Sequence, residues 1–527
     1  MQIINIFIEE LQGAFSAFGN GITSGSLDSF IEGLTALIWS PLTVLLLLGA
    51  GLYFSIRLRF VQVRQIKTMV KLLMSGGSSD EGISSFQAFA LAVAGRVGTG
   101  NIMGVATAIA YGGPGALFWM WLIAFIGAGS AFVESTLAQL YKVEIDGQYR
   151  GGPAYYFGMR GHKLLSIVFM IACIIATGLL LPGIQANSIV TSIHSAFNIQ
   201  PIIIALIIIV LIALIIFGGT KRLGRVAEIV VPFMSGIYIL ASIIILLMNI
   251  TQIPAAFGLI FRSAFGQDAV LGAALGQAIM MGVKRGIFSN EAGQGTGPHA
   301  AAAAEVSHPV KQGLVQAFSV YFDTLLVCSA TGLAIIITGA YSIFIPGTGD
   351  ANGLFHTFAG YSMMGSSPDL IPTFTSQAFS YIMGDFAPKF IGLAIFFFAF
   401  TTLMAVYYYA ESNLELLFEK KTQSFRKSAL LGLRILFLLA ILYFGLTSNT
   451  AAWNVADIGV GVMAIINVIG ILMIGKPAFI SLLDFEKKQK EGLIDQPFKL
   501  SDIPSDLQDN FRGVTFWKDE NINKKYK

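Results

Sequence analysis

The sequence predicts an all-α integral membrane protein, and three observations support this prediction. Of the 527 residues, 55% are hydrophobic and only 12% are charged, whereas soluble domains carry about 25% charged residues. Apolar runs of about 20 residues, the length of a helix that crosses a bilayer, recur along the chain. Lysine and arginine gather in alternate loops between these runs.

Eleven runs have the length and composition of a transmembrane helix, so we expect eleven spans. They lie near residues 37–56, 86–111, 115–140, 164–190, 201–218, 227–249, 270–290, 314–342, 388–412, 428–447 and 451–475. Cys173 and Cys328 fall inside such runs, where a thiol acts as a small apolar side chain. The cysteines therefore predict neither a disulfide nor a metal site.

The segments on either side of the spans differ in character. The first ten residues contain two glutamates and no basic residue, whereas the start of a signal peptide is basic, so no cleaved signal is expected. Residues 1–30 are instead predicted to form a short amphipathic helix on the membrane surface. Residues 31–475 form the predicted transmembrane domain. The charged residues 476–527 are expected to form a tail outside that domain.

The distribution of positive charge predicts the orientation. Residues 57–71, 142–163 and 221–225 are rich in lysine and arginine, whereas the long segment 343–387 has neither. Because basic loops stay in the cytoplasm, we expect the N-terminus outside and the C-terminus inside, in the cell membrane. The topology then explains the net charge of +3, so no nucleic-acid partner is expected. The expected partner of the spans is the lipid bilayer.

Two of the runs are interrupted by glycine and polar residues, at Gly95–Gly104 and Gly282–Gly297. Glycine disfavours a continuous helix. At membrane depth, a broken helix is tolerated only where the freed backbone groups face protein, a cavity or a ligand. The simpler alternative is that these glycines let neighbouring helices pack closely.

The positions of the two interrupted runs favour the first interpretation. They are the second and seventh runs, so that, without the first run, two sets of five remain at about 84–250 and 265–475. Because five is odd, the second set runs in the opposite direction across the membrane. Matched interruptions in two such halves indicate a transporter binding site. We therefore predict one extra N-terminal helix followed by a five-plus-five inverted repeat with two broken helices.

Several motifs resemble the alanine or glycine:cation symporter family. They are Gly98–Ile102, Tyr111–Gly115 with Trp119, Phe288–Ala300, Thr296–Asp323, and Ala399–Thr402 with Tyr407–Glu411. The resemblance covers roughly residues 30–475. It implies the five-plus-five fold of the amino-acid–polyamine–cation superfamily. It also implies sodium-coupled uptake of a small neutral amino acid by alternating access, with alanine, glycine and glutamine all open as substrates.

A zwitterionic amino acid has a carboxylate and an ammonium group, and two broken helices can bind both. The half-helix that begins near Gly100 directs its positive end and free amides at a carboxylate. The resemblance implies the same for this motif and adds Gln185, whose alternative role is a hydrogen bond between helices. The expected substrate positions are Gly98, Thr99, Gly100, Asn101, Ile102 and Gln185, with Phe288, Ser289, Asn290 and Glu291 at the second break.

Sodium needs about five to six oxygen ligands, which neutral carbonyls and hydroxyls can supply. Thr401 and Thr402 are adjacent hydroxyls in an apolar run. The resemblance implies that this pair binds sodium together with the carbonyls of Ala94 and Val97. Alternatively, the hydroxyls bond back to their own helix. No cofactor is expected apart from the co-transported sodium ion.

Other functions find less support. A proton-coupled symporter of the same fold is the nearest alternative, and it would need a titrating acid in place of the threonine pair. The spans contain no metalloprotease or serine-hydrolase motif, so an enzyme is not expected. Ion filters usually form from rings of subunits, which nothing here indicates. We interpret the ionisable residues near the spans as buried pairs, with gating pairs as the alternative: Arg96, Glu134, Lys284, Arg285, Glu291 and Asp323.

Overall fold

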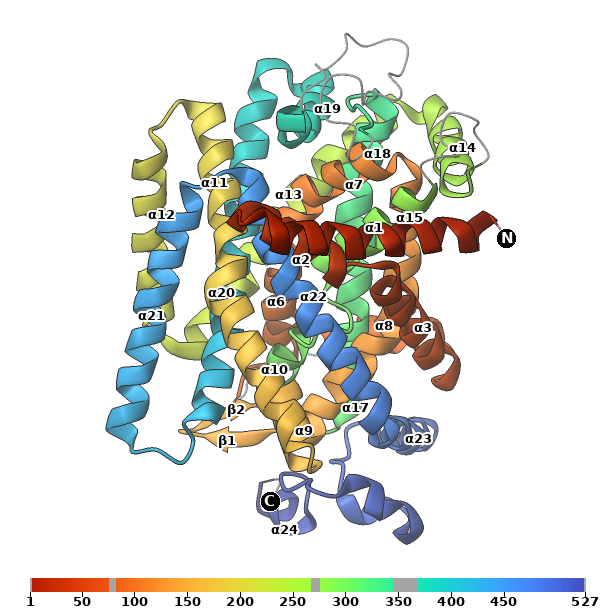
Figure 1. Cartoon of the computed structure of the whole chain (residues 1–527). Helices are drawn as coiled ribbons and strands as arrows, with labels where there is room; N and C mark the ends of the chain where they lie inside the picture. The colour runs from red at the N-terminus through yellow and green to blue at the C-terminus, as the bar shows by residue number, and fades with distance from the viewer. Residues whose placement is uncertain (1, 75–81, 267–274, 345–367, 526–527) are drawn as a thin grey trace.

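The computed structural model describes residues 2–74, 82–266, 275–344 and 368–525, and its regular structure is almost entirely helical. Within these residues the strands Val143–Ile145 (β1) and Gln148–Arg150 (β2) form one antiparallel hairpin. Figure 1 shows long helices that run side by side between two ends of the molecule. The prediction of an all-α membrane protein is confirmed.

The helices lie in chain order on either side of residues 267–274, which are outside the described residues. The first part contains α1 (Gln2–Ser24), α2 (Leu27–Ile38), α3 (Pro41–Arg57), α4 (Val61–Arg64), α5 (Ile66–Met74), α6 (Ser85–Arg96), η1 (Gly100–Gly104), α7 (Val105–Gly112), α8 (Gly115–Leu140), α9 (Pro153–Met159), α10 (Lys163–Ile175), η2 (Ala176–Leu180), α11 (Leu181–Phe197), α12 (Pro201–Ile216), α13 (Gly219–Met248) and α14 (Ile253–Ala264). The second part contains α15 (Leu275–Asn290), α16 (Gly297–Ala303), α17 (Pro309–Tyr321), η5 (Phe322–Cys328), α18 (Ser329–Thr338), η7 (Pro368–Thr373), α19 (Phe374–Met383), α20 (Ala387–Leu417), α21 (Gln423–Gly445), α22 (Asn449–Ile474), α23 (Lys476–Lys490) and α24 (Asp519–Lys525).

The described residues contain eight helical segments that are long and apolar enough to cross a membrane, or nine if the bent pair Ser85–Arg96 and Gly100–Gly112 counts as one span. The two other expected spans correspond to α12 and α15, which have 16 residues each. Part of the expected span 270–290 lies outside the described residues. The total of eleven spans therefore stays a prediction.

Helix α1 lies across the long helices rather than along them, as Figure 1 shows. It packs tightly on α2 through two glycines. A Cβ atom at Gly21 would lie 2.6 Å from the Ser29 carbonyl oxygen, and one at Gly33 would lie 2.6 Å from the Ala17 carbonyl oxygen. Only glycine allows so close a crossing at these two positions. That α1 lies on the membrane surface stays a prediction.

Helices at the same position in the two predicted halves pack against one another. Helix α7 contacts α15, α8 contacts α17, and α11 contacts α20. Contacts between equivalent elements are expected where these elements lie near a two-fold axis that relates the halves. The arrangement accords with the five-plus-five repeat, and the exact repeat boundaries stay a prediction.

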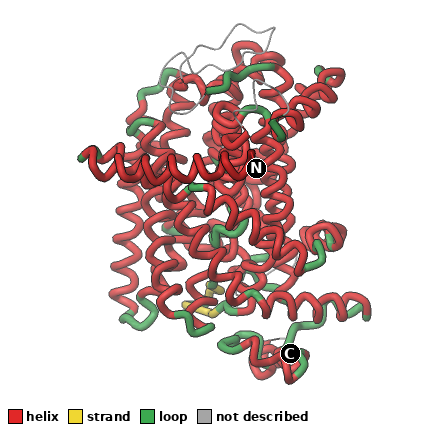
Figure 2. The backbone as a smooth tube through the Cα atoms, turned by 45° about the vertical axis from the view of Figure 1, so that its right-hand side comes forward, coloured by secondary structure: helices red, strands yellow, loops and turns green. Residues whose placement is uncertain are grey.

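The carboxy-terminal segment packs against the helix bundle. Figure 2 shows it at the same end of the molecule as the β hairpin, and we call this end the tail end. The Trp517 side chain is fully buried and its Nε1 donates to the Gln139 carbonyl oxygen of α8 at 2.7 Å. The Phe498 amide donates to the Ser307 carbonyl oxygen at 2.8 Å. Residues 476–527 are thus joined to the helix bundle by their own apolar anchors, which the charge of the segment did not suggest.

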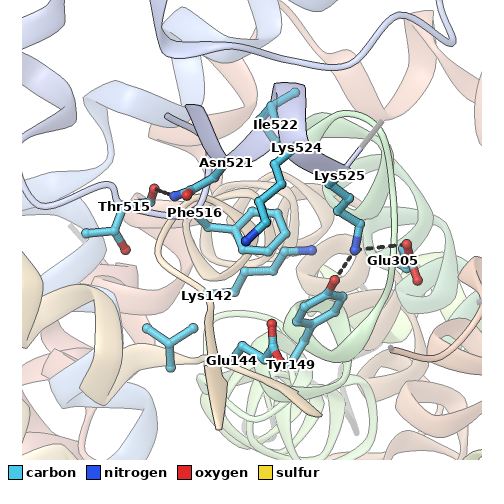
Figure 3. Close-up of a pocket in the computed structure, with 11 residues that line it drawn as sticks. Lys142, Glu144, Tyr149, Glu305, Thr515, Phe516, Asn521, Ile522, Lys524 and Lys525 are labelled. Atoms are coloured by element: carbon cyan, nitrogen blue, oxygen red, sulfur yellow. Dashed lines mark hydrogen bonds and ion pairs between the residues drawn. The ribbon is translucent and has the colours of Figure 1, made fainter. Parts of the chain in front are cut away.

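A cavity of about 600 Å³ lies between the hairpin and α24 (Figure 3). Its lining includes Lys142, whose Nζ lies 4.4 Å from the ring centroids of both Tyr149 and Phe516. Lys525 forms an ion pair with Glu305 at 2.9 Å. Cation–π contacts and this ion pair therefore add to the docking of the segment.

Replacement of Trp517 by alanine is expected to release the carboxy-terminal segment. Loss of a buried tryptophan costs about 3–5 kcal/mol, enough to shift a docked segment toward its free state. Limited proteolysis of the purified protein should then cut after residue 476 much faster than in the wild type. Leu493→Ala is the matched control, because Leu493 is 46% exposed. Equal cleavage rates in both variants would contradict the docking described here.

Candidate functional site

The first interrupted helix breaks where the sequence predicts. Helix α6 ends at Arg96, and Val97 leaves the helical region with φ −77° and ψ 88°. The chain then bends by 52° into the π-helical turn η1 and α7. The Gly98 amide donates to Asn101 Oδ1 at 2.8 Å, and the Thr99 amide donates to Gln185 Oε1 at 3.1 Å. Side-chain oxygens therefore take the place of the missing helical carbonyls.

The second break follows the end of α15. Glu291, Gly293 and Gly295 adopt the left-handed region, with φ of +56°, +80° and +86°. A helix cannot continue through these conformations. The Ala292 amide donates to Asn290 Oδ1 at 2.9 Å, and the Gly293 amide donates to Glu134 Oε1 at 3.1 Å. Both predicted broken helices are therefore present in the structure.

The two breaks face each other in the protein interior. A Cβ atom at Gly100 would lie 3.3 Å from Ser289 Cα and 3.2 Å from a ring carbon of Phe288. Asp323 of η5 bridges the breaks, because it accepts from Asn101 Nδ2 at 2.6 Å and from Ser289 Oγ at 2.9 Å. Five predicted substrate positions lie together around this bridge, and all are buried: Gly100, Asn101, Ile102, Phe288 and Ser289.

Gln185 joins α11 to the first break. Its Oε1 accepts from the Thr99 amide and also from Thr99 Oγ1 at 2.8 Å. In this structure it therefore makes the bond between helices that the sequence leaves open as an alternative. The Asn290 side chain turns toward Thr324 Oγ1, 3.3 Å away. These contacts place Gln185 and Asn290 at the edges of the same buried region.

The predicted sodium ligands meet in part. Thr402 Oγ1 lies 2.9 Å from the Ala94 carbonyl oxygen and 3.5 Å from that of Val97. Thr401 Oγ1 bonds instead to the Phe398 carbonyl oxygen of its own helix, at 2.9 Å. Thr402 Oγ1 lies 3.1 Å from this same carbonyl. Thr402 Oγ1 thus lies among carbonyls of both α6 and α20, and Thr401 Oγ1 is joined to them only through the Phe398 carbonyl.

The Phe398 carbonyl accepts from both hydroxyls. This is the alternative that the sequence leaves open, a bond from each threonine back to its own helix. Thr402 makes it while also contacting the Ala94 carbonyl, so for Thr402 the two interpretations hold together.

The buried charges of α15 are paired on α22. Lys284 Nζ lies 2.7 Å from Asp457 Oδ2, and Arg285 makes two bonds to the same carboxylate at 3.0 and 2.8 Å. The Arg285 guanidinium also lies 4.3 Å from the ring centroid of Trp453. For these two cations the structure shows the expected pairing. Sequence reasoning missed Asp457, an acidic residue within an apolar run.

Two other ionisable residues are held by neutral groups. Glu134 Oε2 accepts from Asn467 Nδ2 at 2.7 Å, in addition to its bond with the Gly293 amide. Arg96 donates to Ser319 Oγ and, at 3.3 Å, to the Gln316 carbonyl oxygen. These bonds join the two breaks to α8, α17 and α22. Among the described residues, Glu134 and Arg96 therefore bond to neutral groups and not to the opposite charges that the sequence led us to expect.

Residues 24–500 match the model of the sodium:alanine symporter family. The chain belongs to this family. Among curated relatives of this symporter, the putative sodium/proton-dependent alanine carrier protein YrbD of Bacillus subtilis is 51% identical over 471 residues, which cover 89% of this chain and 94% of the relative. The probable sodium/glutamine symporter GlnT of Bacillus subtilis is 40% identical over 485 residues, or 91% and 94% of the two chains.

A third relative, the sodium/alanine symporter AgcS of Methanococcus maripaludis, is 38% identical over 455 residues, which cover 85% of this symporter and 94% of the relative. The crystal structure of MhsT in complex with L-phenylalanine matches with a TM-score of 0.50 and 15% sequence identity. The match covers 77% of this chain and 96% of that one. It shows that the two proteins share a fold.

Gly98→Ala is expected to destabilise the symporter. A Cβ atom at Gly98 would lie 2.4 Å from Thr402 Oγ1 and 3.1 Å from Gln185 Oε1, so both side chains would have to shift. Overpacking of this kind costs about 1–3 kcal/mol and should lower the Tm of the purified protein. Gly104→Ala is the matched control, since its nearest neighbour would be 3.7 Å away. A Tm that is equally low in both variants would contradict the close packing at Gly98.

Proposed function

We propose that this symporter couples the entry of sodium to the uptake of a small neutral amino acid, with alanine as the first candidate and glycine and glutamine as the others. The observation that carries the proposal is the meeting of two broken helices, Gly100 against Ser289, in one buried region. The names of the relatives, which include alanine and glutamine carriers, support the substrate class. The family and the fold point to a transporter and not to an enzyme.

The proposed substrate site spans both breaks. The amides of residues 99–102 bind the carboxylate, with Gly98 beside them. The carbonyls of Phe288, Ser289 and Asn290 accept from the ammonium group, with Glu291 beside them. In this structure the Gln185 oxygen occupies the Thr99 amide. A carboxylate oxygen of the substrate is also a hydrogen-bond acceptor, so it replaces Gln185 Oε1 at the Thr99 amide. The Gln185 amide is then free to bond to the substrate.

The proposed sodium site is the group of five oxygens contributed by Ala94, Val97, Phe398, Thr401 and Thr402. Because Ala94 and Val97 end the first half of the broken helix, an ion held there fixes the geometry of the adjoining substrate amides. Sodium and substrate then raise each other's affinity by the same factor. No acid replaces the threonine pair, so the proton-coupled alternative gains no support at this position.

The proposed cycle is alternating access, in which one half of the bundle rocks against the other around a fixed site. The positive-inside rule supports a cell-membrane protein with the tail end in the cytoplasm and the N-terminus outside. Sodium and the amino acid then enter from the end that carries α19 and leave at the tail end (Figure 1).

Uptake of radiolabelled alanine by proteoliposomes tests the proposed function. An inward sodium gradient should drive accumulation, and an equal potassium gradient should not. Competition by unlabelled glycine, serine and glutamine ranks the substrates by size. Uptake that is indifferent to sodium would contradict the proposal.

Thr402→Ala should weaken sodium binding more than Thr401→Ala. Only the Thr402 hydroxyl lies beside carbonyls of both helices. Loss of one ligand, worth about 1–3 kcal/mol, should raise the sodium concentration for half-maximal uptake about five- to hundredfold. Thr402→Ser keeps the hydroxyl and is expected to stay close to the wild type. Equal effects of the two alanine variants would contradict the arrangement.

A further inference from the structure

Asp323 is a fully buried carboxyl group between the two breaks, and neither the proposed substrate contacts nor the sodium site uses it. It lies in the π-helical turn η5. Besides Asn101 and Ser289, it accepts from Thr324 Oγ1 at 2.7 Å. The carboxylate is therefore the common acceptor for a residue of the first break, a residue of the second break and a residue of its own turn.

No lysine, arginine or histidine of the described residues forms an ion pair with Asp323. Three titratable side chains face it: Arg96 from α6, Glu291 after α15, and Cys328 of η5. The Arg96 guanidinium bonds to Ser319 and Gln316, and Cys328 Sγ lies 3.2 Å from Ser289 Oγ. On the other packed helices, Glu134 of α8 bonds to Gly293, and the Tyr238 hydroxyl of α13 lies 2.7 Å from Thr331 Oγ1.

A charged carboxylate held in the membrane interior by neutral donors alone is energetically expensive. A substrate carboxylate at the amides of residues 99–102 lies close to Asp323, because Asn101 belongs to that segment and bonds directly to Asp323. The substrate ammonium group at the Ser289 carbonyl attracts an ionised Asp323, and the substrate carboxylate repels it. A proton on Asp323 removes the repulsion and also the cost of the buried charge.

The neighbours of Asp323 favour a proton over a second sodium ion. Asn101 Nδ2 donates to the carboxylate, and the Ser289 and Thr324 hydroxyls, which donate to the ionised form, can turn and accept from the protonated form. Asn101 Oδ1 already accepts from the Gly98 amide. Sodium would need about five to six oxygen lone pairs, and the oxygens that could supply them lie instead around Thr402.

We propose that Asp323 takes up a proton when the amino acid binds and releases it toward the cytoplasm, so that a proton accompanies sodium and substrate. On binding, an O–H bond forms between one carboxylate oxygen and a proton from water on the outer side. The same bond breaks when the substrate leaves. This inference rests on the proposed substrate site. It assigns the binding of the proton, as a coupling ion in addition to sodium, to one residue.

Proton uptake on substrate binding tests the inference without transport. Purified protein is placed in weakly buffered sodium chloride with a pH-indicator dye, and alanine is added. The wild type should withdraw one proton for each alanine bound. At pH values where Asp323 is ionised in the free protein, each further unit of increase in pH should raise the apparent Kd for alanine by up to about tenfold.

Asp323→Asn keeps the shape and lacks the titrating group. It is expected to bind alanine with an affinity independent of pH and without proton uptake. Glu134→Gln removes another buried carboxyl group and should retain the proton uptake.

Absence of alanine-dependent proton uptake in the wild type would overturn the inference, as would its persistence in Asp323→Asn. Loss of alanine binding at every pH in a monodisperse Asp323→Asn variant would also overturn it, because Asp323 would then be the partner of the substrate ammonium group. Sodium-driven uptake in proteoliposomes is a separate measurement. The proposed function is contradicted if that uptake is absent while proton uptake persists, and the inference about Asp323 is contradicted if proton uptake is absent while sodium-driven uptake persists.

Discussion

Every break in a membrane-spanning helix leaves backbone amides and carbonyls that water does not reach, and the centre of this symporter is arranged around that constraint. The amides freed at the first break bond to Asn101 and Gln185. Those freed at the second break bond to Asn290 and Glu134. Two of these side chains come from neighbouring helices, α11 and α8, so the breaks also fix where those helices pack. Loss of one such bond would leave a buried backbone group unsatisfied as well as weaken the packing of a helix.

The same constraint makes the site ready for a ligand. A side-chain amide oxygen and a carboxylate oxygen are both acceptors, so one can replace the other at the Thr99 amide without leaving a donor unpaired. Asp323 performs a related task at the centre, where it satisfies Asn101 and Ser289 from two different helices at once. The breaks are thus held together by groups that bind each other, and the proposed substrate would exchange partners with them.

Much of this arrangement can be predicted from local sequence. Clustered glycines at 95–104 and 282–297 predicted both breaks, because glycine is a poor helix former and suits the positive φ of Gly293 and Gly295. The approach of Thr402 to Ala94 followed from the family resemblance. What the sequence did not predict depends on long-range packing. Asp457 pairs with Arg285 across 172 residues, and no periodicity links them. For Thr401 the sequence left two roles open, and the choice of the bond to Phe398 is visible only in the structure, where Met234 Sδ of α13 lies 3.8 Å from its hydroxyl. The buried anchors Trp517 and Phe498 were hidden within a charged segment.

The neutrality of the oxygens in the proposed sodium site has an electrical consequence. Three carbonyls and two hydroxyls bring no negative charge, so a sodium ion held among them keeps its full charge as the site changes sides. The loaded site is then more positive than the empty one, and the membrane voltage acts on the step that carries it. An inside-negative potential contributes about 2.3 kcal/mol per elementary charge for each 100 mV. A carboxylate at this position would have cancelled that contribution. The choice of ligand atoms therefore sets how strongly the resting potential of the cell drives the accumulation of substrate.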